Sequence, residues 1–196
     1  MFFNHNIETV IFDCDGVLAD TMPLHCEAYY RAFKEFGLSF ERELFYRSAA
    51  GKARDTIKKL LAGQNYEDDW CKLHQRKKEI VIELIDSELQ PLASARLVPL
   101  LNRGYRLSVV SSGSAISVHR IVNHLGLSNY FEEIITGDDV KLGKPNPEPF
   151  LLAAKKMMVA PEKCLVIEHS EAGIQAAERA GMDSINVYSF IPKITS

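Results

Sequence analysis

The pattern of apolar and polar residues divides the chain into one helical stretch and a longer stretch in which two kinds of element alternate. Val10 to Phe12 form a short apolar run that ends at Asp13, which is typical of a buried strand that enters a loop. Between residues 20 and 90, apolar residues recur at helical spacing and we predict no strand. After Pro91, short apolar runs alternate with helical segments. The sequence therefore predicts an α/β core that is interrupted by a helical insertion.

The α/β part is predicted to contain a parallel sheet. Strands that alternate with helices of ordinary length form right-handed βαβ crossovers, which make the strands parallel and place helices on both faces of the sheet. Ligands of such sheets bind beyond the carboxyl ends of the strands, near a topological switch point. The predicted helices of the insertion are 24–36, 55–61 and 68–85; the later helices are 95–102, 116–125, 147–158 and 172–180, and the later strands are 107–110, 134–135, 165–167 and 185–188.

Polar residues follow four of the predicted strands. Asp13 and Asp15 follow the first strand, Ser111 the second, Lys144 the third and Glu168 the fourth. Because the carboxyl ends of parallel strands lie at one edge of a sheet, we expect these side chains to meet there. Carboxylates bind Mg²⁺, lysine and serine bind phosphoryl oxygens, and a carboxylate can attack phosphorus once the surrounding charge is neutralised. Singly, each residue is a common turn residue, helix cap or solvated charge; together they predict metal-assisted phosphate chemistry.

Composition and charge limit which binding partners and which cellular compartment we expect. The chain has 196 residues, of which 46% are hydrophobic, and its 26 acidic and 23 basic residues give a net charge of −3. This balance does not favour bulk binding to nucleic acid or to anionic membranes, and no apolar run approaches the ~20 residues of a membrane span. We find no signal peptide and no Cys-x-x-Cys pair. We therefore expect a cytoplasmic protein with reduced cysteines that binds neither nucleic acid nor membrane, as a monomer or a weak homo-oligomer.

Four motifs follow one another along the chain: Asp13-Cys14-Asp15-Gly16-Val17-Leu18-Ala19-Asp20-Thr21, Val109-Val110-Ser111-Ser112, Gly143-Lys144-Pro145-Asn146-Pro147-Glu148, and Val166-Ile167-Glu168-His169-Ser170 with Gly173 and Gly181-Met182. Their content and order resemble the haloacid dehalogenase-like (HAD) superfamily, specifically its β-phosphoglucomutase-like and sugar-phosphate phosphatase branch. The match covers residues 10–182. It implies a Rossmann-like doubly wound parallel sheet made by residues 1–19 and 91–196, with a small inserted α-helical cap domain at 20–90.

The resemblance implies a role for each acidic residue at the strand ends. Asp13 would be the nucleophile that forms an aspartyl-phosphate, and its carboxylate would also touch Mg²⁺. Asp15 would be the general acid and base, which protonates the leaving alcohol and later activates water, with its backbone carbonyl on the metal. Glu168 would hold the metal directly or through water.

Other positions of the resemblance imply substrate contacts. Ser111, with the loop residues Ser112 and Gly113, would bind phosphoryl oxygens, and Lys144 would neutralise their charge.

Within the cap, His25 and the segment 51–54 align with family positions that face the active site. Arg54 is a candidate clamp for a distal anionic group, because guanidinium geometry suits phosphate or carboxylate, and Lys77 is a further candidate. The alternative for each is an exposed charged side chain on a helix. The cap would close over the site and exclude water.

One residue departs from the family pattern at the metal site. His169 stands where the fourth motif normally has an aspartate that binds the metal. Imidazole is a poor ligand for Mg²⁺ and favours Zn²⁺, Mn²⁺ or Ni²⁺. Three interpretations follow: a weakened enzyme, an altered metal preference, or a catalytically inactive relative. We expect Mg²⁺ to bind weakly and Mn²⁺ to support more activity, and Asp138 and Asp139 to lie close enough to compensate.

Two further positions bear on the reaction type. The mutases that the chain resembles carry lysine where Ala50 stands, and Ala115 follows Ser114 without the usual Lys-Asn signal. Fewer cationic groups favour simple hydrolysis over the reorientation of a bisphosphate. We therefore expect a phosphatase that acts on a small phosphorylated metabolite, such as a sugar or sugar-acid phosphate. A β-phosphoglucomutase-like mutase and a non-catalytic binding protein are the alternatives.

Overall fold

A computed structural model describes residues 6–48, 53–66 and 70–189 of the chain. The chain forms two compact units, residues 1–20 with 90–196 and residues 21–89. We call them the α/β unit and the helical unit. Their boundaries lie one residue away from the predicted domain boundaries. None of the helices in the described part of the chain combines the length and the apolar character that a membrane crossing requires.

The α/β unit contains a five-stranded parallel sheet with the strand order β3-β2-β1-β4-β5. Phe12, the last residue of β1, pairs with Val109 of β2 and Ile167 of β4, so the ends of these central strands are level with one another. The predicted parallel α/β fold is therefore confirmed. The strands are β1 Thr9–Phe12, β2 Arg106–Val110, β3 Glu133–Ile135, β4 Cys164–Glu168 and β5 Asp183–Asn186.

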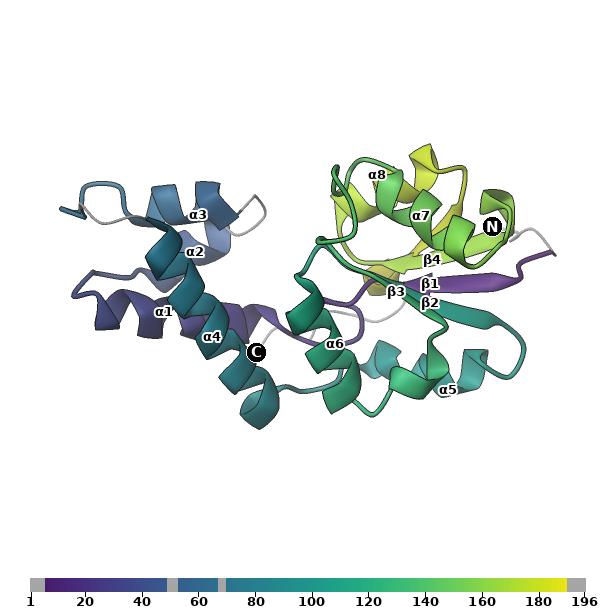
Figure 1. Ribbon diagram of the computed structural model, residues 1–196, viewed down its shortest axis with the longest axis horizontal. Coiled ribbons are helices and arrows are strands. Elements are labelled where there is room, and N and C mark those ends of the chain that lie inside the picture. The colour runs from purple at the N-terminus through teal and green to yellow at the C-terminus, as the bar shows by residue number, and fades with distance from the viewer. Residues whose placement is uncertain (1–5, 49–52, 67–69, 190–196) are drawn as a thin grey trace. The chain divides into compact units, whose positions relative to one another are not determined.

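Helices cover both faces of this sheet, with α7 and α8 on one side and α5 and α6 on the other (Figure 1). Ile11, Val110 and Val166 of the central strands pack against Phe150 of α7 and Ala176 of α8. Because helices cover both faces of the sheet, β1 is buried at every position. A strand buried in this way needs apolar side chains on both faces, which explains its run of apolar residues. The helices are α5 Leu97–Leu101, α6 Ala115–His124, α7 Glu148–Lys156 and α8 Glu171–Arg179.

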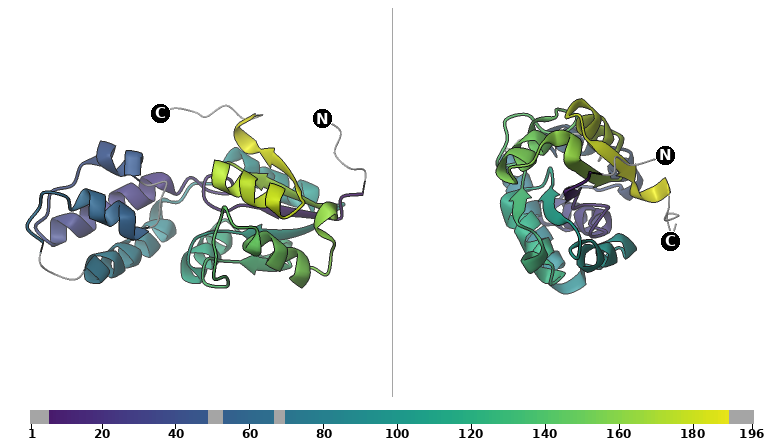
Figure 2. Two further views of the ribbon diagram at one scale, coloured as in Figure 1. Left: turned by 90° about the horizontal axis from the view of Figure 1, so that it is seen from above. Right: turned by 90° about the vertical axis from the view of Figure 1, so that its right-hand side faces the viewer.

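The helical unit contains helices and no strand in the part that the structure describes (Figure 2). Its two longest helices, α1 and α4, pack against each other, because each carries an apolar stripe that includes Phe33 in α1 and Ile80 in α4. The helix α2 was not predicted as a separate element. The helices are α1 Met22–Glu35, α2 Arg42–Ser48, α3 Ala53–Leu60 and α4 Trp70–Glu88.

Two predicted elements differ in the structure. The last strand spans Asp183–Asn186 rather than 185–188, and residues Val187–Ser189 form a 3₁₀ turn. β5 is an edge strand, and its first two residues, Asp183 and Ser184, are polar. A prediction from apolar residues alone therefore begins this strand two residues too late. The predicted helix 95–102 is a 3₁₀ turn at Ala93–Arg96 followed by the short helix α5.

Candidate active site

Asp13 begins the loop after β1 and lies between β2 and β4, the two strands that flank β1. The backbone N–H of Asp13 donates to the carbonyl of Ile167 in β4 at 2.9 Å, so the residue continues the strand pairing by one position. The chain then turns, because the Cys14 carbonyl accepts the N–H of Leu18 at 2.8 Å and Gly16 adopts a φ of 73°. A positive φ of this kind favours glycine. The sharp turn leaves Asp13 buried at the carboxyl end of the sheet.

Lys144 reaches this position from the loop between β3 and α7. Its Nζ lies 2.8 Å from Asp13 Oδ1, 2.8 Å from Glu168 Oε1 and 3.0 Å from the Val110 carbonyl. Burial alone lowers the pKa of Lys144, but the charges of Asp13 and Glu168 outweigh burial and raise it above its ordinary value. The ammonium group is therefore charged and bridges the two carboxylates.

Glu168, the last residue of β4, is more deeply buried than Asp13, and its side chain is 1% exposed. Its Oε2 accepts the backbone N–H groups of His169 and Ser170, both at 2.6 Å, and the Ser170 hydroxyl at 3.0 Å. Burial raises the pKa of Glu168, but the charge of Lys144 and these hydrogen bonds outweigh it, so the pKa lies below its ordinary value. Gly173 provides the space for this side chain, because a Cβ at position 173 would overlap the Glu168 carboxylate.

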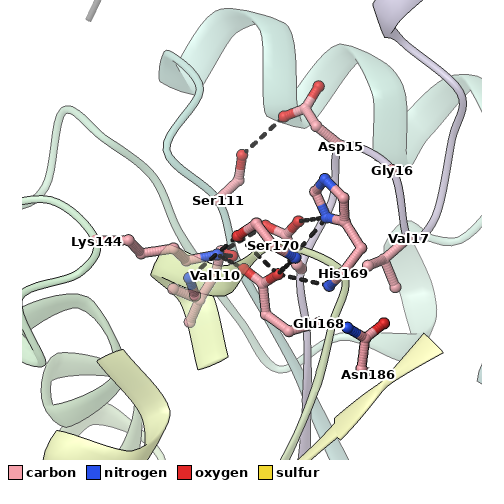
Figure 3. Close-up of polar contacts among 12 residues, drawn as sticks. Asp15, Gly16, Val17, Val110, Ser111, Lys144, Glu168, His169, Ser170 and Asn186 are labelled. Atoms are coloured by element: carbon pink, nitrogen blue, oxygen red, sulfur yellow. Dashed lines mark hydrogen bonds and ion pairs between the residues drawn. The ribbon is translucent and has the colours of Figure 1, made fainter. Parts of the chain in front are cut away.

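His169 binds the second oxygen of Asp13. Its Nδ1 lies 3.2 Å from Asp13 Oδ2. The same nitrogen lies 3.6 Å from Glu168 Oε2 (Figure 3). The imidazole lies directly over Gly16, where a Cβ would come within 2.8 Å of Nε2. The imidazole and the Tyr188 ring are nearly perpendicular, with centroids 6.0 Å apart. Burial lowers the pKa of His169, but its hydrogen bond to Asp13 and the nearby carboxylate charges outweigh burial and raise it.

A second group of polar residues lies beside this cluster. The Ser111 hydroxyl, at the end of β2, donates to Asp15 Oδ2 at 3.2 Å and accepts the backbone N–H of Gly113 at 3.0 Å (Figure 3). Ser112 is exposed on the same loop. The carboxyl ends of β1 and β2 therefore hold a hydroxyl, a carboxylate and loop residues in one place.

The cluster has the donor set of a cation site. One ligand atom each from Asp13, Glu168 and His169 lie within 4.8 Å of one another. Two carboxylates and one imidazole fit a divalent cation, and the imidazole favours a softer ion than Mg²⁺. Asp15 is not part of this group of side chains, and its predicted contact through the backbone carbonyl stays a prediction.

Asp138 and Asp139 have other partners than this cluster. Asp138 Oδ2 accepts the backbone N–H of Ala115 at 2.8 Å, and Asp139 Oδ2 accepts the backbone N–H and the hydroxyl of Thr136 at 2.8 and 2.7 Å. Both carboxylates thus stabilise loops at the carboxyl ends of β2 and β3. The expectation that they compensate for His169 is not supported by these contacts.

Comparison with known proteins identifies the family. A family model described as "Haloacid dehalogenase-like hydrolase" matches residues 10–187. The chain belongs to this family. Among the similar proteins, the fructose-1-phosphate phosphatase YqaB of Escherichia coli (strain K12) is 34% identical over 180 residues, which are 91% of this chain and 95% of that protein. The β-phosphoglucomutase of Bacillus subtilis (strain 168) is 27% identical over 190 residues, which are 92% of this chain and 83% of that protein.

Solved structures agree with this assignment. The structure of CbbY from Rhodobacter sphaeroides in complex with phosphate superimposes with a TM-score of 0.80 and 28% sequence identity, covering 91% of this chain and 84% of that one. Phosphatase and phosphoglucomutase reactions both transfer a phosphoryl group. The comparisons therefore support a sugar-phosphate phosphatase or a phosphoglucomutase-like function for this HAD-like hydrolase.

The predicted substrate residues of the helical unit lie in two places. Lys77 is buried, and its Nζ lies 2.8 Å from His25 Nδ1 and 4.9 Å from the centre of the Tyr29 ring. Arg54 is exposed, and its guanidinium lies 5.8 Å from the centre of the Trp70 ring. Residues 50–52, which include Ala50 and Gly51, lie outside the described part of the HAD-like hydrolase.

Sequence reasoning gave no role to three residues that shape these sites, although Ser170 stands in the fourth motif. Ser170 caps α8, since its side chain accepts the N–H of Gly173, and a serine that begins a helix after a strand was a usable signal. Tyr188, whose hydroxyl donates to the Gly16 carbonyl at 3.3 Å, gave no signal because its position depends on the end of β5. Trp70 gave none because its contact is to a different helix.

Proposed function

We propose that the protein is a phosphatase that hydrolyses a small phosphorylated metabolite, a sugar or sugar-acid phosphate, through an aspartyl-phosphate on Asp13. One observation carries this proposal: Lys144 and His169 each bind one oxygen of the buried Asp13 carboxylate. A nucleophile fixed in this way faces its target with little loss of conformational freedom. The phosphatase names of its relatives support the same reaction class.

In the first step, Asp13 attacks phosphorus. A bond forms between its carboxylate oxygen and phosphorus, and the bond between phosphorus and the sugar oxygen breaks. Asp15 donates a proton to the leaving oxygen. Lys144 offsets the negative charge that gathers on the phosphoryl oxygens, and Ser111 with the Ser112 and Gly113 backbone donates hydrogen bonds to them.

In the second step, water attacks the phosphorus of the acyl phosphate. Asp15, now ionised, accepts a proton from this water, the bond between Asp13 and phosphorus breaks, and inorganic phosphate leaves. Both residues return to their starting states, so the cycle is balanced without a further co-reactant.

HAD hydrolases generally use Mg²⁺, and Asp13, Glu168 and His169 would hold such an ion together with the Asp15 carbonyl. A bound divalent cation would supply positive charge to the phosphoryl oxygens. We propose that Mn²⁺ serves better than Mg²⁺, because His169 replaces a hard oxygen ligand with an imidazole nitrogen.

We propose that the helical unit is the cap domain and supplies substrate recognition through His25, Arg54 and Lys77. We further propose that the protein acts in the cytoplasm, binds neither nucleic acid nor membrane, and is a monomer or a weak homo-oligomer. Its free thiols support a reducing compartment; they are Cys14, Cys26, Cys71 and Cys164.

A substrate panel tests the function. Fructose 1-phosphate, 6-phosphogluconate and β-glucose 1-phosphate are incubated with the protein and either Mg²⁺ or Mn²⁺, and both released phosphate and isomerised sugar are measured. We expect free phosphate, faster with Mn²⁺. Isomerised sugar without free phosphate would show a mutase instead, and binding without either product would show a non-catalytic relative.

A further inference from the structure

The turn that follows β5 brings Tyr188 to the carboxyl ends of the central strands. Glu168, the last residue of β4, pairs with Asn186, the last residue of β5, so the residues that follow both strands leave the sheet at the same level. The backbone N–H of Tyr188 donates to Asn186 Oδ1 at 3.0 Å, which fixes the start of the turn. An aromatic side chain is therefore placed beside the residue that follows β4, which is His169.

Tyr188 contacts both the imidazole of His169 and the loop on which this imidazole lies. The two rings are nearly perpendicular, at 89°, with centroids 6.0 Å apart. The Tyr188 hydroxyl donates to the Gly16 carbonyl at 3.3 Å. Gly16 lies against the same imidazole, since a Cβ there would come within 2.8 Å of Cδ2 and Nε2. Gly16 and Tyr188 thus both bound the imidazole and are bonded to each other.

The orientation of this imidazole decides what it offers to a cation. Its Nδ1 lies 3.2 Å from Asp13 Oδ2. The same nitrogen lies 3.6 Å from Glu168 Oε2. A half-turn of the ring about its bond to Cβ would exchange Nδ1 with the carbon Cδ2, and a carbon atom binds no cation. This torsion is broad in histidine, and the side chain is 31% exposed, so burial alone does not select one orientation.

An aspartate at this position, as in the usual fourth motif, would depend less on these neighbours. It is shorter than histidine and lacks atoms that correspond to Nε2 and Cε1, two of the three ring atoms that approach Gly16. The oxygens of a carboxylate are equivalent, so a half-turn changes nothing for the cation. The contacts of Gly16 and Tyr188 therefore matter for an imidazole in a way that they would not for a carboxylate.

We infer that Tyr188 is a positioning residue for His169: its ring and its hydrogen bond to Gly16 hold the imidazole with Nδ1 toward Asp13 and Glu168, so that His169 can bind a divalent cation. Groups that orient a metal ligand without touching the metal contribute to metal affinity. This inference rests on the cation site of the proposed phosphatase. It adds a residue outside the four motifs to that site.

The test is a double-mutant cycle on Mn²⁺ binding, measured by isothermal titration calorimetry without substrate. For Tyr188→Leu we expect the Mn²⁺ affinity to fall about tenfold. Tyr188→Phe loses the hydrogen bond and keeps the ring, so we expect a loss of about twofold to threefold. In the His169→Asp background, Tyr188→Leu should change the affinity less than about twofold, because the two sites no longer interact. Equal losses in both backgrounds would show a general structural effect and overturn the inference.

Tyr105→Leu is the matched control. Tyr105 is 39% exposed and directly precedes β2, so it lies at the amino end of the sheet, away from the cluster. We expect its Mn²⁺ affinity to equal that of the wild type. A loss as large as that in Tyr188→Leu would contradict a role through His169.

A second variant serves if Tyr188→Leu does not fold. Asn186→Ala removes the acceptor of the Tyr188 N–H and leaves the tyrosine side chain in place. We expect the Mn²⁺ affinity to fall about threefold in this variant, and to stay unchanged when Asn186→Ala is added to His169→Asp. Wild-type affinity in Asn186→Ala, or the same loss in both backgrounds, would overturn the inference.

Phosphate release, measured in parallel, separates this inference from the proposed function. If the wild type hydrolyses no phosphoester but the loss in Tyr188→Leu depends on His169, the proposed function fails and the positioning role stands. If hydrolysis occurs and Tyr188→Leu binds Mn²⁺ as the wild type does, the positioning role fails alone. A wild type that hydrolyses phosphoesters but binds no Mn²⁺ would also overturn the inference.

Discussion

Among the described residues, the α/β unit contains buried ion pairs as well as exposed ones, whereas the ion pairs of the helical unit are all at least partly exposed. In the α/β unit, Lys144 and Glu168 pair at 2.8 Å with side chains only 6% and 1% exposed. In the helical unit, Arg76 and Glu35 pair at 2.7 Å with side chains 33% and 46% exposed. Exposed pairs contribute little to stability, because water and salt screen them, whereas breaking a buried pair leaves an uncompensated charge.

The buried pairs lie among the proposed catalytic residues. The buried pairs of the α/β unit fix the oxygens of Asp13 and Glu168, and fixed dipoles and charges are what a phosphoryl-transfer site requires. In the helical unit, the exposed guanidinium of Arg54 lies over the ring of Trp70 instead. The following predictions challenge or sharpen this contrast, in order of decreasing effect.

Replacing the nucleophile should have the largest effect. For Asp13→Asn we expect kcat to fall roughly 10³–10⁵-fold, because the amide does not form an acyl phosphate. Phosphate release under saturating substrate measures this. Asp183→Asn, at an exposed position that begins β5 in the same unit, should keep kcat within about twofold. Comparable losses in the two variants would refute the role of Asp13.

Breaking the buried pair should cost stability as well as activity. For Lys144→Met we expect the free energy of unfolding near neutral pH to fall by about 3–5 kcal/mol, measured by urea unfolding. In Lys163→Met the exposed pair with Glu8, at 2.6 Å, is lost, and we expect a change below about 1 kcal/mol. Similar losses in both would contradict the contrast between buried and exposed pairs.

The pH dependence of this pair follows from the two pKa shifts. Glu168 has a lowered pKa in the folded protein, so its contribution is present above its ordinary value of 4.5 and is lost as the pH falls through the lowered value. Lys144 has a raised pKa, so its contribution is present below its ordinary value of 10.5 and is lost as the pH rises through the raised value. The stability difference between wild type and Lys144→Met should therefore shrink in strong acid and in strong base.

Restoring an aspartate should change the metal preference. For His169→Asp we expect Mg²⁺ to bind about tenfold more tightly and the advantage of Mn²⁺ to shrink, because an oxygen ligand replaces an imidazole. Isothermal titration calorimetry with each ion measures this without turnover. His119→Asp, at an exposed position of α6, is the control for added charge. Unchanged affinities in His169→Asp would remove His169 from the metal site.

The smallest predicted effect belongs to the helical unit. His74 has a pKa of about 4 in the folded protein against an ordinary value of 6.5, so the unfolded chain binds more protons between these values and stability falls as the pH drops from 6.5 to 4. After allowance for solvent screening, we expect a loss on the order of 1 kcal/mol. Urea unfolding followed by Trp70 fluorescence measures it. His74→Phe should flatten this pH dependence; an unchanged slope would show another titrating group.

Much of the sheet was predictable from the sequence. Four of its strands are short apolar runs that stop at a polar residue, and their alternation with helices predicts the parallel pairing that the structure shows at Phe12, Val109 and Ile167. The same logic brought Asp13, Lys144 and Glu168 to one edge of the sheet, although Asp13 and Lys144 are 131 residues apart in sequence.

Other features depend on packing that no local pattern records. The start of β5 is set by pairing with β4 and not by apolar residues, which is why the predicted strand lies too late. The position of the His169 imidazole depends on the open space at Gly16 and on the edge of Tyr188. Trp70 meets Arg54 only because α3 and α4 pack together.

The central claim, that Asp13 accepts the phosphoryl group, is tested most directly by trapping. The protein is mixed with substrate and Mn²⁺, quenched in acid within a single turnover, and the peptide that carries Asp13 is examined by mass spectrometry. We predict one phosphoryl group on Asp13 that disappears in Lys144→Met or when turnover is allowed to finish. Steady hydrolysis with no phosphoryl group on this peptide at any quench time would contradict the account.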